Sequence, residues 1–240
     1  MPQSSSMIDP WKIHTLVLDV DDTLFPERDF VLGGFAAAGK WLRAQLGVDG
    51  FSATATRLFE AGLRGRIFDE SLDAMDVPIS PELVGELVVA YRSHQPTLTL
   101  FPDAARLLSR AVGRVNVALL TDGFEAVQRN KIEALALDPR IELRVITDAL
   151  GGRNFWKPCP EGFRLVMRRY PGESGGYVYV GDNPRKDFLG PRALGWRTVR
   201  IKREGGEHST YVANPDEEAD IVVTDLTELS QHFGWEENGR

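Results

Sequence analysis

Two carboxylates follow the first apolar run of the chain, with one residue between them. Asp19 and Asp21 belong to the stretch Asp19–Thr23, which comes directly after Leu16-Val17-Leu18. A buried strand would project both side chains beyond its end, where the chain turns and backbone N–H groups become available. Such oxygens suit Mg²⁺, and a carboxylate whose charge is offset by metal can attack phosphorus while its neighbour moves protons. The alternative is a turn whose aspartates cap a helix.

Three further polar motifs follow apolar or glycine-rich segments. Thr121-Asp122-Gly123 ends a second apolar run, where a hydroxyl and backbone N–H groups can hold phosphoryl oxygens. Lys157 follows Gly151-Gly152, and its ammonium could neutralise both a nucleophile and a phosphoryl group. Asp182, within Gly181–Asp187, offers another carboxylate to a metal. Each motif alone has an ordinary explanation as a capped turn or a solvated lysine, but together they favour one shared site.

The segments that must position these motifs alternate between strand-like and helix-like patterns. Short apolar runs predict strands at Leu16–Leu18, Val115–Leu120, Leu143–Ile146, Tyr177–Val180, Thr198–Ile201 and, more weakly, Ile221–Val223. Helical patterns lie between them at Pro102–Val112, Phe124–Leu137, Glu161–Arg169 and Pro184–Leu194. This alternation predicts an α/β fold with a doubly wound, mostly parallel sheet, whose functional groups gather at the carboxyl ends of the strands.

The stretch Phe30–Pro96 breaks this alternation because it contains no convincing strand. Three helical segments are expected there, separated by Gly47–Ser52 and Pro78–Pro81. The sequence therefore predicts a catalytic core of residues 1–28 and 98–240 with an inserted helical cap of residues 29–97.

Composition excludes several classes of function. The 240 residues carry a net charge of -7, which argues against a nucleic-acid-binding surface. No apolar stretch reaches the roughly 20 residues of a membrane-spanning helix. The single cysteine, Cys159, favours a reducing cytoplasmic setting. Residues 1–11 lack the pattern of a secretory signal and are expected to form a frayed tail.

The four motifs resemble those of the haloacid dehalogenase-like (HAD) hydrolase superfamily. The matching segments are Leu18–Thr23, Leu120–Gly123, Lys157 and Gly181–Asp187, and the resemblance covers nearly all of the chain. It implies a Rossmann-like core, with an all-helical cap between the first and second motifs, in the phosphatase branch of the superfamily. Two positions depart from the common pattern, since Asp122 stands where many relatives carry Asn, and Asp22 where Gly or Asn is frequent.

The resemblance also implies a role for each motif residue. Asp19 would be the nucleophile that forms an aspartyl-phosphate, and Asp21 the general acid and base. Thr121, Asp122 and Lys157 would hold the substrate phosphate. Mg²⁺ would be held by Asp19, Asp182 and the backbone carbonyl of Asp21. Asp187 would lie outside the ligands and orient Lys157 or a water on the metal.

Several alternatives remain open from the sequence. Carbon–halogen cleavage is disfavoured because dehalogenating relatives lack the acid at the position of Asp21. A phosphomutase or phosphotransferase would use the same nucleophile. A receiver-like phospho-accepting module would need less of the chain and has no helical cap. A non-catalytic binding protein on the same scaffold is disfavoured by the intact Asp19 and Asp21. The expected substrate is a small phosphorylated metabolite, namely a nucleotide monophosphate, a sugar phosphate or a phospho-acid. The expected state is a monomer or homodimer. The loop Lys202–His208 follows a strand end and is expected to border the site.

Overall fold

The computed structural model of the protein describes residues 11–235, which form two compact units. An α/β unit contains the residues up to Pro26, Thr99–Gln128 and the residues from Ala136 onward, and a helical unit contains Glu27–Leu98 and Arg129–Leu135. The frayed tail predicted for residues 1–11 lies outside the described residues except for Trp11. The Trp11 N–H donates to the His232 carbonyl at 2.7 Å, so that residue is held in place.

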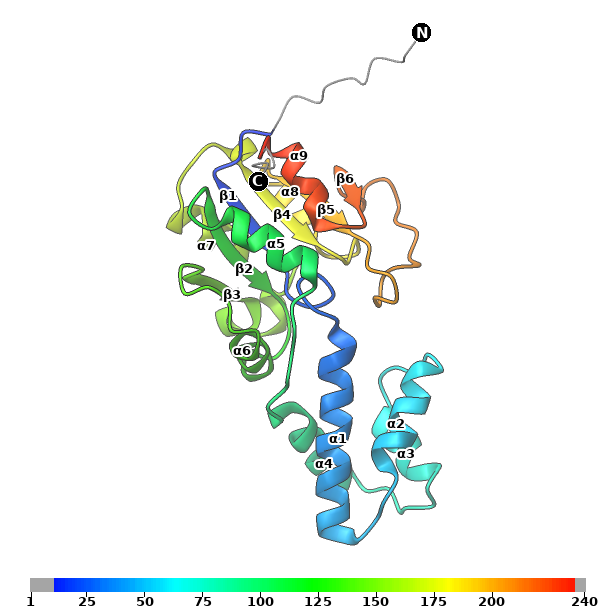
Figure 1. Ribbon diagram of the computed structural model, residues 1–240. Coiled ribbons are helices and arrows are strands. Elements are labelled where there is room, and N and C mark those ends of the chain that lie inside the picture. The colour runs from blue at the N-terminus through cyan, green and yellow to red at the C-terminus, as the bar shows by residue number, and fades with distance from the viewer. Residues whose placement is uncertain (1–10, 236–240) are drawn as a thin grey trace. The chain divides into compact units, whose positions relative to one another are not determined.

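Within residues 11–235, six parallel strands form the sheet of the α/β unit (Figure 1). Their order is β3-β2-β1-β4-β5-β6, which places the first strand in the middle of the sheet. The strands are β1 (Thr15–Leu18), β2 (Asn116–Thr121), β3 (Leu143–Ile146), β4 (Tyr177–Gly181), β5 (Arg197–Ile201) and β6 (Ile221–Val223). Nearly continuous apolar runs are typical of parallel strands covered on both faces. Each strand ends within one residue of its predicted bounds, and the predicted α/β fold class is confirmed.

Helices lie between the strands of this unit, and the last of them follows β6. They are α5 (Pro102–Ala111), α6 (Glu125–Ala134), α7 (Glu161–Arg169), α8 (Leu189–Arg192) and α9 (Leu229–His232). Short 3-10 turns occur at Thr147–Leu150, Arg153–Phe155, Ser174–Gly176 and Leu226–Glu228. From Arg129 onward, the residues of α6 belong to the helical unit.

The helix predicted over Pro184–Leu194 is wrong for most of its length, because only α8 is helical there. Side chains bind the backbone of this segment and compete with helix formation. The Asn183 N–H donates to Asp187 Oδ2 at 2.9 Å, and the Arg185 N–H donates to Asn183 Oδ1 at 3.1 Å. The fourth motif is therefore a rigid turn that points the Asp187 carboxylate back toward the strand ends.

Aromatic packing between α7 and β4 fixes the strand that leads into this turn. The Tyr177 ring stacks on Trp196 with centroids 4.7 Å apart, and Phe163 meets Tyr179 edge-on at 5.2 Å. All four side chains are buried in one apolar core together with Val17, Ala118 and Leu120 of the neighbouring strands. Burial of this kind is the main stabilising contribution to the sheet.

The helical unit contains α1 (Glu27–Leu46), α2 (Phe51–Glu60), α3 (Ile67–Asp73) and α4 (Pro81–Ser93). Three helical segments were expected, and the middle one is divided into α2 and α3. Gly62 and Gly65 in the connection have φ angles of 91° and 84°, which glycine adopts at low cost and which end a helix. Across residues 11–235, no helix has both the length and the apolar character that crossing a membrane requires.

Candidate active site

The ends of three neighbouring strands bring the polar motifs together. Leu18 of β1 pairs with Leu119 of β2 and with Val180 of β4, so the next residues along each strand lie at one edge of the sheet. Asp19 follows β1 directly, and its N–H donates to the Val180 carbonyl at 2.9 Å. The alignment explains why motifs more than 100 residues apart in sequence meet in space.

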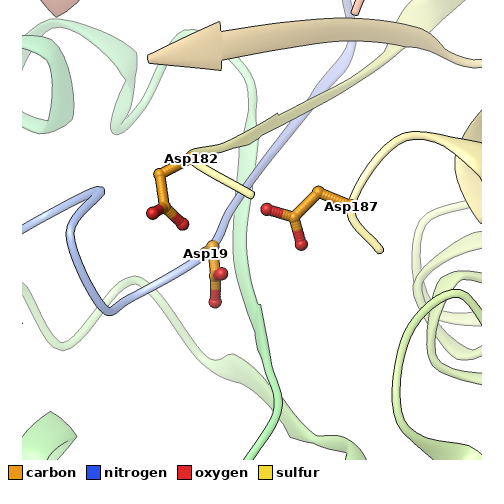
Figure 2. A group of neighbouring side chains, drawn as sticks. All are labelled: Asp19, Asp182 and Asp187. Carbon is orange, nitrogen blue, oxygen red and sulfur yellow. The ribbon is translucent and has the colours of Figure 1, made fainter. Parts of the chain in front are cut away.

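Three carboxylates face one another at this edge, as Figure 2 shows for Asp19, Asp182 and Asp187. One oxygen from each lies within 4.8 Å of the corresponding oxygens of the other two. The Asp19 and Asp187 side chains are buried, and Asp182 is largely so. Close approach of buried carboxylates is unfavourable unless cations compensate them.

Lys157 supplies one such cation from the loop before α7. Its Nζ lies 2.8 Å from Asp19 Oδ2 and 2.8 Å from Asp187 Oδ1, and its side chain is completely buried. Burial acts to lower the pKa of Lys157, but Asp187 and Asp19 outweigh it and hold that pKa well above the ordinary value. Lys157 therefore carries a positive charge between two aspartates.

Tyr179 of β4 completes the surroundings of this ammonium. The Lys157 Nζ donates to the Tyr179 hydroxyl at 2.7 Å, and that hydroxyl donates to the Leu120 carbonyl at 3.3 Å. Burial, assisted by the charges of Asp187 and Asp19, raises the pKa of Tyr179 well above its ordinary value. The protonated phenol thus holds Lys157 against the end of β2.

The carboxylates respond differently to this environment. Burial alone would raise the pKa of Asp19, yet Lys157 and Lys186 lower it below its ordinary value, so Asp19 is ionised. Burial and the neighbouring charges of Asp187 and Asp19 raise the pKa of Asp182 well above its ordinary value. The charged form of Asp182 is therefore disfavoured at this site unless a further cation compensates it.

This donor set fits a magnesium ion. Mg²⁺ prefers oxygen ligands and binds through one or two carboxylates with further oxygens around it. Asp19 and Asp182 each present a carboxylate oxygen within 4.8 Å of the other, and a divalent cation would favour the charged form of Asp182. Asp187 already contacts Lys157 through Oδ1 and the Asn183 N–H through Oδ2, consistent with a place outside the ligands.

The second motif uses its two polar side chains in different ways. Asp122 Oδ1 accepts from Thr147 Oγ1 at 2.7 Å and from the Lys157 N–H at 2.9 Å. Its Oδ2 accepts from Lys186 Nζ at 3.0 Å. With its carboxylate holding three donors, Asp122 can offer a phosphate only its backbone N–H, whereas the Thr121 hydroxyl lies at the strand end itself.

The loop after β5 binds the turn that follows Asp19. The Glu207 N–H donates to Asp22 Oδ2 at 2.9 Å, and Arg203 Nη2 donates to the Thr23 carbonyl at 2.7 Å. Arg203 Nη1 also pairs with the buried Asp103 at 2.6 Å. Asp22, the unusual residue of the first motif, thus acts as an acceptor that joins two loops.

Sequence reasoning missed several residues of the site. They are Gln128, which contacts Asp21 and Thr121, and Thr147, Tyr179 and Lys186. Lys186 lies inside the fourth motif, and its positive charge among carboxylates could have marked it as a site residue. Gln128, Thr147 and Tyr179 occupy a helix, a 3-10 turn and a strand where nothing in the local pattern marks them.

Comparisons with known proteins agree with this geometry. Residues 13–195 match the family described as haloacid dehalogenase-like hydrolase. A phosphoserine phosphatase of Thermus thermophilus is 29% identical over 214 residues, covering 87% of this chain and 80% of the relative. A glyceraldehyde 3-phosphate phosphatase of Methanocaldococcus jannaschii is 25% identical over 228 residues, covering 89% and 98%.

A solved structure has the same fold. The HAD-hydrolase YfnB of Bacillus subtilis, described as bound to magnesium, superposes with a TM-score of 0.66 at 18% identity, covering 92% of this chain and 99% of that one. The family match spans most of the chain, and the strand ends carry the buried acidic cluster with its lysine. The chain therefore belongs to the haloacid dehalogenase-like hydrolase family, and it is a phosphatase of that family.

Proposed function

We propose that this phosphatase hydrolyses the phosphate monoester of a small metabolite in a Mg²⁺-dependent reaction, through an aspartyl-phosphate on Asp19. The observation that carries the proposal is the position of Lys157 Nζ, 2.8 Å from both Asp19 and Asp187, two carboxylates that cluster with Asp182. An ionised Asp19 held against a buried ammonium can approach an anionic phosphate, because the phosphate charge is offset where the two meet.

In the first step an Asp19 oxygen attacks phosphorus. The bond from phosphorus to the leaving oxygen breaks, and Asp21 gives that oxygen a proton. Lys157 and the Thr121 hydroxyl hold the phosphoryl oxygens. When bound by Asp19, Asp182 and the Asp21 carbonyl, Mg²⁺ supplies further positive charge to those oxygens.

In the second step water attacks the same phosphorus. Asp21, now a carboxylate, accepts a proton from that water, and the bond between phosphorus and Asp19 breaks. Inorganic phosphate leaves and both aspartates return to their starting states. Asp187 holds Lys157 in place throughout, which is consistent with their 2.8 Å ion pair.

Residues 29–97 would act as the cap that selects the leaving group. The helical unit has an apolar core of its own, which supports treating it as a separate body. Two relatives are named for phosphoserine and for glyceraldehyde 3-phosphate, so a phospho-acid and a triose phosphate are suitable first substrates alongside nucleotide monophosphates. A cytoplasmic location is part of the proposal and rests on the single Cys159.

Phosphate release from such a panel tests the proposal, with and without Mg²⁺, for the wild type, Asp19→Asn and the control Asp138→Asn, an aspartate that is 34% exposed and pairs with Arg140. We expect release that requires the metal, survives in Asp138→Asn and disappears in Asp19→Asn. After acid quenching with substrate carrying radiolabelled phosphate, the wild-type protein should retain the label and Asp19→Asn should not. Label that passes to an acceptor substrate without phosphate release would indicate a phosphomutase or phosphotransferase, and full activity of Asp19→Asn would refute the mechanism.

A further inference from the structure

Gln128 of α6 joins two groups that the proposed reaction uses for different purposes. Its Nε2 lies 3.0 Å from Asp21 Oδ2 and 2.7 Å from Thr121 Oγ1, and the residue is 1% exposed. The amide nitrogen carries two N–H groups and no acceptor, so it donates to both Asp21 Oδ2 and Thr121 Oγ1. One buried amide therefore contacts the acid of the first motif and the hydroxyl of the second.

The local backbone is shaped around this side chain. A Cβ at Gly123 would lie 3.3 Å from both Cγ and Cδ of Gln128, and Gly123 has a φ of 119° that L side chains rarely adopt. The start of α6 is held in turn, because the Glu125 N–H donates to Asp148 Oδ2 at 3.1 Å. The glycine of the second motif thus leaves room for Gln128 to reach the strand ends.

We propose that Gln128 is a positioning residue that aims both the acid and the phosphate-binding hydroxyl, an inference that rests on the proposed function. Since Asp21 Oδ2 accepts from Gln128, the proton given to the leaving oxygen departs from Oδ1. Oδ1 is thereby the oxygen that must face the leaving group, and Gln128 determines the rotation of the carboxyl group that achieves this.

The same amide prepares Thr121 to donate. Its Oγ1 accepts from Gln128, which leaves the hydroxyl hydrogen for an acceptor. In the structure the Thr121 hydroxyl oxygen lies 3.5 Å from the Asp122 carbonyl oxygen, a long contact that a phosphoryl oxygen can replace. Removing the amide would therefore loosen the acid and the phosphate-binding hydroxyl together.

The two effects separate when the leaving group is varied. A nitrophenolate leaves without protonation, whereas an alkoxide requires the proton from Asp21. Misplacement of Asp21 therefore slows alkyl phosphates selectively, while misplacement of Thr121 slows both substrates alike.

The test measures kcat/KM on nitrophenyl phosphate and on an alkyl phosphate, for the wild type, Gln128→Met and Gln128→Glu. We expect the loss on the alkyl phosphate to exceed the loss on nitrophenyl phosphate by about tenfold or more, as misplacing a catalytic group by a fraction of an ångström implies. Thr121→Val is the matched comparison and should lower both substrates by the same factor. Gln231→Met, an exposed glutamine on α9, should change neither.

Each result bears on one of the two proposals. Equal losses on both substrates in the Gln128 variants would overturn the positioning role and leave the phosphatase mechanism standing. No release from the wild type on either substrate would overturn the proposed function, and this inference with it. If Gln128→Met fails to fold, Gln128→Glu has the same shape and also lacks the N–H groups, and its activity on nitrophenyl phosphate reports that the site is formed.

Discussion

The two compact units bury different kinds of side chain. The α/β unit encloses ionisable side chains, among them Asp19, Asp103, Lys157, Asp182, Asp187, Arg200 and Arg203. The core of the helical unit is apolar and consists of Phe35, Ala38, Leu42, Phe51, Ala55, Ile67, Leu72 and Leu87. In that unit's described residues, Ser71 and Lys131 are the buried polar side chains.

The difference shows that the α/β unit accepts less stabilising buried groups at the place where the reaction occurs. Burying a charge is unfavourable unless it is paired, and a well-packed apolar core generally does better. In the helical unit apolar packing dominates, and its buried Lys131 is paired with Glu27. In the α/β unit some buried charges form the site and others, such as Arg203 on the Thr23 carbonyl, hold its loops in place.

The strongest test of this comparison is Lys157→Met. The change leaves Asp19 and Asp187 buried without their shared cation, so we expect a loss of about 3–5 kcal/mol in the free energy of unfolding. Phosphatase activity should fall by about a thousandfold, because the phosphoryl charge loses its partner. Denaturant unfolding and phosphate release measure the two effects. Lys12→Met, on an exposed lysine, is the control, and equal stability of the two variants would contradict the assignment.

A core substitution in the helical unit should act through packing only. Leu72→Ala removes a fully buried side chain, and we expect a loss of about 2–5 kcal/mol in unfolding free energy from lost burial and the cavity left behind. Leu46→Ala, at a side chain that is 55% exposed in the same unit, should change it by less than about 0.5 kcal/mol. Similar values for the two variants would mean that the apolar core does not stabilise this unit.

Magnesium should stabilise the protein because it relieves the repulsion among the three carboxylates. At a concentration about 100 times its Kd, the ion adds about 2.7 kcal/mol to the free energy of unfolding. Thermal unfolding across a magnesium titration measures this, and EDTA should reverse it. Asp182→Asn should raise the stability without metal and remove most of the response; an undiminished response would place the ion elsewhere.

The smallest effect belongs to an exposed ion pair of the α/β unit. Arg169 lies 2.9 Å from Glu142, but both side chains are more than half exposed. Arg169→Gln should change the free energy of unfolding by no more than about 1 kcal/mol and leave phosphate release unaltered. A change as large as that of Lys157→Met would show that burial is not what separates the two classes of charge.

Most of the fold could be predicted because its signals are local. The run Leu143–Ile146 has strand length and composition and lies between helical patterns, and its bounds were predicted as observed. The region Pro184–Leu194 misled prediction because its helical pattern competes with hydrogen bonds from Asn183 and Asp187 side chains. Those bonds depend on where the turn lies in the folded protein.

The site residues also divide into those with a local sequence signal and those that depend on contacts in the folded protein. Asp19 and Asp182 directly follow strands, and Lys157 and Asp187 lie shortly after Gly152 and Gly181. The parallel sheet brings such positions together. Their catalytic roles and the cap assignment for residues 29–97 remain predictions. Gln128 could not be predicted as a site residue from the sequence, because its role depends on hydrogen bonds to Asp21 and Thr121. These residues lie 107 and 7 positions away in sequence.

The contacts that hold the turn after Asp19 form between segments that are synthesised at different times. Thr23 and Asp22 are held by Arg203 and Glu207, which follow them by 180 and 185 residues. At ordinary rates of translation those partners are synthesised on the order of ten to forty seconds after the turn. Contacts of such long range also slow folding. A growing chain thus carries Asp19 well before it carries the loop that holds Asp19's turn in place, and the site is completed late in synthesis.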